Sequence, residues 1–444
     1  MLALVKNGYR PLFIDLVRLI TSPLEALTNI HHAHGDFVQT KFFNKDLVFV
    51  SKPESFEEIF SLEAKGLLNR DSMYNAKKPV FGDSIFNSRG DTWTSQRRLM
   101  QPLFTKEAVT GWQGIFVEEA AAFTQRLTGY GSAQINISKE VKLLVQSVII
   151  RVLFGRQGKQ NKDIELIECI DTIVAGVFFA LVTEVLGKGG LSLLFVPQNR
   201  RMKKAVARFV AYVYDEIDRN NEAFNHNLIA LMADAKDKNT GYAMTKELLK
   251  DEAVTMFLGG QDTTINTLVW FFYMMGLNPK AQDKIINEVM SFKDDEITAA
   301  NLAKLSYTRA ALNETLRLYP QATGLSRDVA NDIMIGGHPV NKGASVVLSI
   351  YVTHRNPGIW KKPDDFYPEH FLGQQEGYRH KFGFLPFGAG IHNCIGRHLA
   401  ELEMLTVITT FYRSMKITGV NNLNEKVSFS LKPDKDLIAT VSKI

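Results

Sequence analysis

Apolar positions recur every three or four residues through most of the chain before Pro320, and this spacing predicts a mainly helical protein. The period is clearest in SKEVKLLVQSVIIRVLFG and NRRMKKAVARFVAYVYDEIDR, inside a helical region that we place from about Glu54 to Met290. Two earlier segments, GDFVQTKFF and DLVFVSKP, instead alternate apolar and polar residues, and the second closes on Pro53. They predict a small β-hairpin.

The pattern changes beyond Pro320. Short strand-like pieces, DIMIGGHPV and ASVVLSIYV, alternate with turns, and a last helix is predicted from about Ile395 to Arg413. No internal repeat, low-complexity tract or long Pro/Gly/Ser linker interrupts the sequence. We therefore expect a single domain over residues 1–444, mainly α with minor β sheets, of the α+β class.

Composition and charge exclude several functional classes. The 444 residues are 45% hydrophobic and 22% charged, which is typical of a globular protein with a large core. The net charge of +5 comes from lysines and arginines scattered among acids, without a basic stripe and interleaved aromatics, so we expect no nucleic-acid partner. Two cysteines without a secretory signal fit a reducing compartment, and we expect the protein to be cytoplasmic.

Neither of the two most apolar segments predicts a membrane anchor. The N-terminal MLALVKNGYRPLFIDLVRLI contains four charged residues, so it cannot supply the run of about 20 apolar residues that a span needs, and it predicts an amphipathic helix. The run TIVAGVFFALVTEVLG has only twelve residues between Asp171 and Glu184. It predicts a buried helix or a hydrophobic lid.

The stretch FGAGIHNCIG places a cysteine among three glycines. Gly388, Gly390 and Gly396 let the backbone pass close to a flat partner and turn several N–H groups inward. A thiolate needs such donors and a nearby helix N-terminus to hold its charge, and the predicted last helix begins just after Cys394. Cys169, inside ELIECIDTIV, is instead expected to be a buried small hydrophobe.

This stretch resembles the cysteine loop of the cytochrome P450 family, F-x-x-G-x-[R/H]-x-C-x-G, and is similar to that of the soluble bacterial members. The match falls on Phe387, Gly390, His392, Cys394 and Gly396. The resemblance implies a P450-like fold, with a long central helix over a haem and the cysteine loop beneath it. It also implies haem b (iron protoporphyrin IX) as the cofactor, with Cys394 as the ligand of its iron.

Other segments resemble the family in the same order along most of the chain. GDTWTSQRRLMQPLF carries Trp93 and Arg97, which at four-residue spacing share a helix face and are expected to donate to one haem propionate. SRDVANDIMIGGHPVNKGASV resembles the strand pair in which Arg327 is expected to reach the other propionate. These three residues, together with Gly259, Phe387, His392, Cys394 and Gly396, are the expected cofactor-binding set.

The segment LGGQDTTINTLVW resembles the part of the central helix that carries an acid and an alcohol above the haem. Gly259 and Gly260 remove side chains from the helix at a cost of about 1 kcal/mol each, which calls for a reason such as room for dioxygen. Asp262 and Thr263 are expected to be the catalytic pair that handles protons.

NETLRLYP resembles the helix that carries the family's buried structural ion pair, here Glu314 and Arg317, three residues apart on one face. The later WKKPDDFYPEHFL matches F-x-P-E-R-F except that His370 replaces the arginine. Histidine offers fewer donors than arginine and titrates near neutral pH. We expect the pairing with Glu314 to survive in a weaker form.

The complete acid and alcohol pair favours a monooxygenase that inserts one oxygen atom from O2 into an apolar substrate, by hydroxylation or epoxidation. Two alternatives remain, a haem-thiolate peroxygenase or rearrangement enzyme, and a haem-binding sensor or gas carrier. No flavin or nicotinamide domain is visible in the sequence, so a ferredoxin or flavodoxin-type donor is expected to supply electrons.

The resemblance also predicts an apolar substrate pocket. Its expected walls are the Ser72 to Gly90 loop, the Val174 to Phe195 region, the Met256 side of the central helix, and Ala322 to Leu325. The large apolar residues expected on them are Phe81, Phe86, Phe178, Phe179, Leu193, Leu194 and Phe195. Lys77 and Lys78 are expected to face solvent, where either could hold a substrate carboxylate at the pocket mouth.

Overall fold

A computed structural model describes most of the chain. The described residues are 18, 21–42, 45–130, 133–157, 161–185, 196–220, 227–238, 240–291, 297–373 and 380–444. The amphipathic helix expected over the first twenty residues lies almost entirely outside them, as do the expected wall residues Leu193, Leu194 and Phe195. None of the helices in the described part is both long enough and apolar enough to span a membrane.

The chain divides into two compact units. The first comprises Met1–Tyr74, Phe179–Phe195 and Asn313–Cys394, and the second comprises Asn75–Phe178, Val196–Leu312 and Ile395–Ile444. Two helices, α9 (Asn161–Val185) and α15 (Ser306–Leu318), run from one set of ranges into the other. The expected single domain over residues 1–444 stays a prediction.

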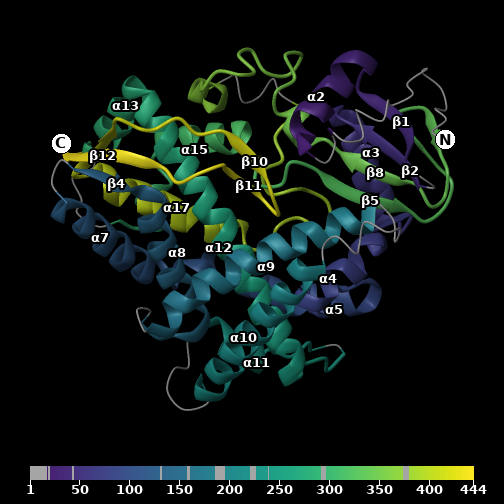
Figure 1. Cartoon of the computed structure of the whole chain (residues 1–444), viewed down its shortest axis with the longest axis horizontal. Helices are drawn as coiled ribbons and strands as arrows, with labels where there is room; N and C mark the ends of the chain where they lie inside the picture. Colours follow the sequence, from purple (N-terminus) through teal and green to yellow (C-terminus); the bar gives the residue numbers. More distant parts are fainter. Residues whose placement is uncertain are drawn as a thin grey trace. The chain divides into compact units, whose positions relative to one another are not determined.

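The first unit is built on a five-stranded sheet with strand order β1-β2-β8-β5-β3 (Figure 1). β2 and β8 are parallel, and the other neighbours are antiparallel. The hairpin predicted before Pro53 is confirmed as β1 paired with β2, with Phe37 opposite Val50. The strands are β1 (Phe37–Phe42), β2 (Lys45–Val50), β3 (Leu68–Asn69), β5 (Leu325–Val329) and β8 (Ser345–Leu348).

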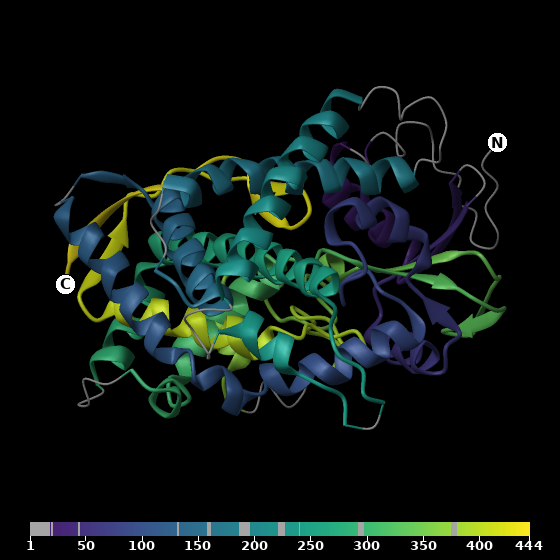
Figure 2. The same cartoon turned by 90° about the horizontal axis from the view of Figure 1, so that it is seen from below.

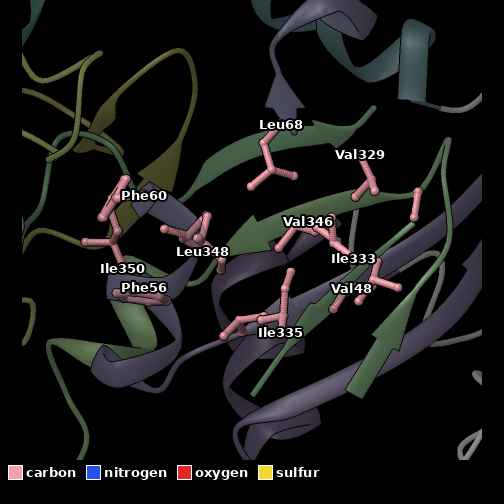
Figure 3. Packing of buried hydrophobic residues seen from close by; sticks show 14 of the residues in the cluster. Val48, Phe56, Phe60, Leu68, Val329, Ile333, Ile335, Val346, Leu348 and Ile350 are labelled. Atoms are coloured by element: carbon pink, nitrogen blue, oxygen red, sulfur yellow. The ribbon is translucent and has the colours of Figure 1, made fainter. Parts of the chain in front are cut away.

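Helix α3 (Pro53–Ala64) covers part of the core of this unit. Its Phe56 and Phe60 lie next to Leu348 and Ile350, as Figure 3 shows. Phe56 is fully buried and Phe60 is nearly so. Each such side chain contributes about 1.5–3 kcal/mol by leaving water, so this core fixes α3 against the sheet.

The remaining elements of the first unit are short. They are α2 (Pro23–His34), η1 (Asp71–Met73), β6 (Ile333–Ile335), β7 (His338–Val340), α16 (Ile350–Thr353) and η4 (Pro368–Phe371). The strand-like DIMIGGHPV is confirmed as the antiparallel pair of β6 and β7. In ASVVLSIYV, by contrast, the strand ends at Leu348, and the last apolar residues lie in the short helix α16. One more hydrogen bond to the neighbouring strand follows, from Ser349 N–H to Val50 O at 2.7 Å.

The second unit is mainly helical, and its long central helix is α12 (Lys246–Leu277), of 32 residues. α12 packs against α8 and α10, while α7 packs against α8 and α17. Trp270, Phe271 and Phe272 of α12 are almost completely buried. The other helices are α4 (Tyr74–Phe81), α5 (Gly90–Met100), η2 (Gln101–Phe104), α6 (Lys106–Thr110), α7 (Gln113–Gly129), α8 (Ile137–Phe154), α10 (Val196–Asn220), α11 (Leu228–Asp234), α13 (Pro279–Met290), α14 (Ala299–Leu302) and α17 (Arg397–Tyr412).

Two small sheets complete the second unit. One has the order β4-β12-β9, and the other is the hairpin of β10 and β11. Figures 1 and 2 both place the C-terminal strands, in yellow, beside the blue α7. The strands are β4 (Gln134–Asn136), β9 (Met415–Thr418), β10 (Glu425–Val427), β11 (Leu431–Pro433) and β12 (Ile438–Lys443). The mainly α class with minor β sheets is thus confirmed.

Candidate active site

The cysteine loop of the first unit is closed on itself by left-handed glycines. Gly388 and Gly390 have φ angles of 67° and 71°, which side chains rarely tolerate. Cys394 N–H donates to Phe387 O at 2.9 Å. A Cβ on Gly390 would lie 2.8 Å from Cδ1 of Phe60, so α3 leaves no room for a side chain there. The backbone of the loop therefore requires glycine at 388 and 390.

Cys394 is exposed on this loop, and α17 begins three residues later, with Gly396 as its N-cap. No disulfide links Cys394 to Cys169, and Cys169 is only partly buried on α9. Within the described ranges, no group of three His, Cys, Asp or Glu side chains could hold a metal ion. A single thiol on an exposed glycine turn suits a metal that brings its other ligands with it, and a porphyrin does so.

Glu63 brings together two candidate residues. Its Oε1 lies 2.5 Å from Arg327 Nε and 2.6 Å from His392 Nδ1, and its Oε2 lies 3.3 Å from Arg327 Nη2. Burial opposes ionisation of Glu63, but hydrogen bonds from His392 and Arg327 outweigh it and hold the pKa of Glu63 below its usual value. Burial also holds the pKa of His392 below its usual value, against the attraction of Glu63. The arrangement is therefore an Arg327–Glu63 ion pair to which a neutral imidazole donates through Nδ1.

Sequence patterns did not single out Glu63. The signal was present, because Phe56, Ile59, Phe60 and Glu63 recur at helical spacing and put an acid into the apolar stripe of α3. A buried acid needs cationic partners, since an unpaired charge in the interior is very costly. Glu63 is 2% exposed, and Arg327 is 3% exposed.

The buried ion pair of the first unit has the expected members. Arg317 donates to Glu314 through Nε at 2.7 Å and through Nη2 at 2.8 Å, and both residues are completely buried. His370 Nδ1 lies 3.2 Å from each oxygen of Glu314. His370 thus occupies the expected position at longer distances than Arg317. Tyr367 N–H also donates to Glu314, at 2.8 Å.

In the second unit, Trp93 and Arg97 lie on α5 one turn apart and are both partly buried. The shared face predicted from their four-residue spacing is therefore present. The loop before α5 is held by side chains of that helix, because Gln96 Nε2 donates to Asp83 O at 2.7 Å. Lys77, expected to face solvent, is instead buried, with its Nζ 4.8 Å from the centre of the Phe86 ring. Lys78 is exposed as expected.

The acid and alcohol pair lies in α12 beside an open glycine face. A Cβ on Gly259 would meet nothing within 4 Å, whereas one on Gly260 would lie 3.1 Å from Ile149 Cδ1. Thr263 Oγ1 donates to Gly259 O at 2.8 Å. Asp262 is partly buried and accepts a hydrogen bond from Ser430, a residue that sequence patterns did not single out. Burial raises the pKa of Asp262, although Ser430 and the positive charge of Lys432 favour its ionised form.

The chain is similar to known proteins along nearly its whole length. The sequence model of the family described as Cytochrome P450 matches residues 8–438. Cyclooctat-9-en-7-ol 5-monooxygenase of Streptomyces melanosporofaciens is 27% identical over 422 residues, which cover 93% of this chain and 89% of that protein. Cytochrome P450 4c3 of Drosophila melanogaster is 27% identical over 409 residues, which cover 84% of this chain and 75% of that protein. The crystal structure of the cytochrome P450DA heme domain matches with a TM-score of 0.85 at 19% identity, covering 99% of this chain and 97% of that one.

Proposed function

The chain belongs to the cytochrome P450 family, and on that premise we propose that it inserts one oxygen atom from O2 into an apolar substrate by hydroxylation or epoxidation. It is a cytochrome P450 monooxygenase with haem b as cofactor, and such enzymes act on organic molecules with electrons from a redox partner. The observation that carries the proposal is the glycine turn that presents Cys394.

Cys394 is the proposed ligand of the haem iron. A haem with a thiolate ligand supplies the chemistry of O–O cleavage when it is bound. The chain's own contribution begins with the turn, because the left-handed glycines and the Cys394 N–H to Phe387 O hydrogen bond fix the position of the thiol. Gly396, at the start of α17, completes the motif.

Arg327, Trp93 and Arg97 are the proposed partners of the haem carboxylates, because guanidinium and indole N–H groups suit a carboxylate. His392 is proposed to contribute to cofactor binding indirectly, because a neutral imidazole has one N–H and here donates it to Glu63. Glu63 accepts hydrogen bonds from Nε and Nη2 of Arg327. These two bonds fix the plane of the guanidinium group and so the direction of its remaining N–H donors.

Asp262 and Thr263 are the proposed proton-handling pair. A Cβ on Gly259 would meet nothing within 4 Å, and the hydrogen bond from Thr263 Oγ1 to Gly259 O sets the rotamer of the threonine one turn later. The raised pKa of Asp262, caused mainly by burial, brings the acid closer to the pH at which it can both take up and release a proton.

The proposed substrate is a largely apolar molecule. Phe81 and Phe86, which lie in one of the expected walls, pack at 4.8 Å between ring centres, and Phe429 packs against both at 5.9 and 6.0 Å. A relative of similar length carries the name of a monooxygenase of cyclooctat-9-en-7-ol, an unsaturated alcohol. Burial of apolar surface at about 25 cal/mol per Å² supports micromolar binding without an ionic contact. With Lys77 buried, Lys78 is the better candidate to meet a terminal carboxylate.

For the electron donor we propose a ferredoxin or flavodoxin-type protein, and for the location the cytoplasm. The test is oxidation of a panel of apolar compounds by the purified holoenzyme, with cyclooctat-9-en-7-ol and fatty acids of increasing length. One reaction set receives a ferredoxin, its reductase and ¹⁸O2, and a parallel set receives hydrogen peroxide. Products with one ¹⁸O atom, and affinity that rises with apolar area, are expected. Turnover with peroxide alone, at a higher rate than with the ferredoxin, would support a peroxygenase instead.

A further inference from the structure

One row of side chains on α12 is tied to the turn between β10 and β11. Asp262, Asn266 and Trp270 are spaced four residues apart and so share a helix face. Asp262 Oδ2 accepts from Ser430 Oγ, Asn266 Nδ2 donates to the same Ser430 Oγ at 2.8 Å, and Trp270 Nε1 donates to Leu431 O at 3.3 Å. Figure 1 shows this hairpin beside α12. The acid of the proposed proton-handling pair is thus held by a second element.

The direction of these hydrogen bonds is set by the donors available. Asn266 donates to Ser430 Oγ, so the hydroxyl proton of Ser430 is directed to Asp262. Ser430 is 3% exposed, which keeps water from replacing it as the donor. The hydroxyl therefore fixes one oxygen of the Asp262 carboxyl group, and the adjacent Thr263 keeps its own bond to Gly259 O.

Other charges also face Asp262. Burial raises its pKa, the hydrogen bond from Ser430 and the positive charges of Lys432 and Lys142 lower it, and the negative charge of Asp171 raises it. Lys142 and Asp171 form an ion pair at 2.9 Å, so their effects largely cancel. Ser430 is the only hydrogen-bond donor among these groups in the described part of the chain.

The other side of the β10–β11 turn contacts an aromatic cluster made of Phe81, Phe86 and Phe429. Phe429, next to Ser430, packs against Phe81 and Phe86 at 5.9 and 6.0 Å between ring centres. Thr255 of α12 donates at 2.6 Å to Ser84, which lies between Phe81 and Phe86 in the sequence. The turn therefore lies between the acid and a proposed apolar wall, so a displacement of Phe429 would displace the Ser430 hydroxyl.

We propose that Ser430 is a positioning residue for Asp262, and that the β10–β11 turn connects the aromatic cluster to the acid that supplies protons. The proposal rests on the function proposed above for Asp262 and Thr263. Without the Ser430 hydroxyl, the Asp262 carboxyl group loses the hydrogen-bond donor that favours its ionised form. Its side chain is then also no longer held in one rotamer. Proton delivery then becomes slower than the competing release of hydrogen peroxide.

A matched pair of variants tests the positioning role. Ser430→Thr keeps the hydroxyl and adds a methyl group. Ser430→Val has nearly the same shape as Ser430→Thr but lacks the hydroxyl. Ser428→Val, in the same turn, is the control. The C=O stretching band of protonated Asp262, identified by its loss in Asp262→Asn, is followed against pH in the ferric holoenzyme. We expect the midpoint of Ser430→Val to lie about 1 pH unit above that of the wild type, because a hydrogen bond to a charged group is lost. Ser430→Thr and Ser428→Val should match the wild type.

A second measurement separates positioning from a purely structural tie. Hydrogen peroxide released per reductant consumed is measured with dodecanoic acid as the apolar probe. We expect a several-fold increase in Ser430→Val and near wild-type values in Ser430→Thr. If Ser430→Val and Ser430→Thr showed the same midpoint of the Asp262 C=O band against pH and the same peroxide release, the proposal would be overturned. This would hold even if both variants unfolded more easily than the wild type. If the wild-type enzyme did not oxidise dodecanoic acid, the proposed substrate class would be wrong for fatty acids, and the infrared midpoints would still decide the role of Ser430.

Discussion

Glu63 Oε1 lies 2.5 Å from Arg327 Nε, deep in the first unit, and the same oxygen accepts a hydrogen bond from His392 two residues before Cys394 in the sequence. One buried carboxylate thus orients two side chains that the P450 motifs assign to the haem. Its pKa is lowered because the bonds from His392 and Arg327 outweigh the effect of burial, so it is ionised at neutral pH.

Glu63→Gln should lower the free energy of unfolding of the holoenzyme by about 3 kcal/mol, because Arg327 would remain buried without its anionic partner. Haem should also leave the variant several-fold faster, as measured by transfer to apomyoglobin. Glu54→Gln, at an exposed position of the same helix, is the control. A wild-type rate of haem transfer in Glu63→Gln would show that Glu63 does not orient the two side chains toward the cofactor.

His370→Arg should raise the free energy of unfolding at neutral pH by about 1 kcal/mol. The natural imidazole lies 3.2 Å from both oxygens of Glu314, whereas a guanidinium would donate two shorter hydrogen bonds to that carboxylate. Denaturant unfolding of both proteins at pH 7 measures this, with His32→Arg, at an exposed position of α2, as the control. Equal free energies of unfolding would show that the pairing with Glu314 gains nothing from a guanidinium at position 370.

Glu403→Gln should make the second unit more stable at alkaline pH. Burial raises the pKa of Glu403, on α17, to about 8 from 4.5, and its Oε1 has no hydrogen-bond partner among the described residues. The folded protein retains this proton between pH 4.5 and 8 while the unfolded chain releases it, so the stability from this group falls as pH rises through that window.

The expected difference is therefore negligible near pH 4.5 and reaches several kcal/mol in favour of Glu403→Gln at pH 8 and above. Unfolding midpoints in denaturant at a series of pH values measure it. Glu107→Gln, at an exposed position of α6, should show no such trend. A constant offset across the whole range would mean that Glu403 does not keep its proton in the folded state.

Thr263→Ala should bind apolar ligands with unchanged affinity but release more reducing equivalents as hydrogen peroxide. The hydroxyl that donates to Gly259 O beside the open face would be absent, so protons would be poorly positioned. Product formed per reductant consumed should fall several-fold, and Thr263→Ser should restore most of it. Wild-type coupling in Thr263→Ala would exclude the pair as the proton route.

Sequence patterns predicted the fold because its elements are local features of the chain. The β1–β2 hairpin follows from alternation, α12 and α17 from helical period, and the Glu314–Arg317 contact from three-residue spacing on one helix. Glu63 and Ser430 could not be paired with their partners in this way, because Arg327 and Asp262 are distant in sequence. The burial of Lys77 and the end of β8 at Leu348 likewise depend on tertiary packing.

The central claim, that Cys394 is the ligand of the haem iron, is tested most directly by the absorption spectrum of the reduced, CO-bound protein. The wild-type protein and Cys169→Ser should both show the red-shifted band that reports thiolate ligation. Cys394→Ser and Cys394→His should lose it while retaining bound haem. An unchanged band in either Cys394 variant, or its loss in Cys169→Ser alone, would contradict the assignment.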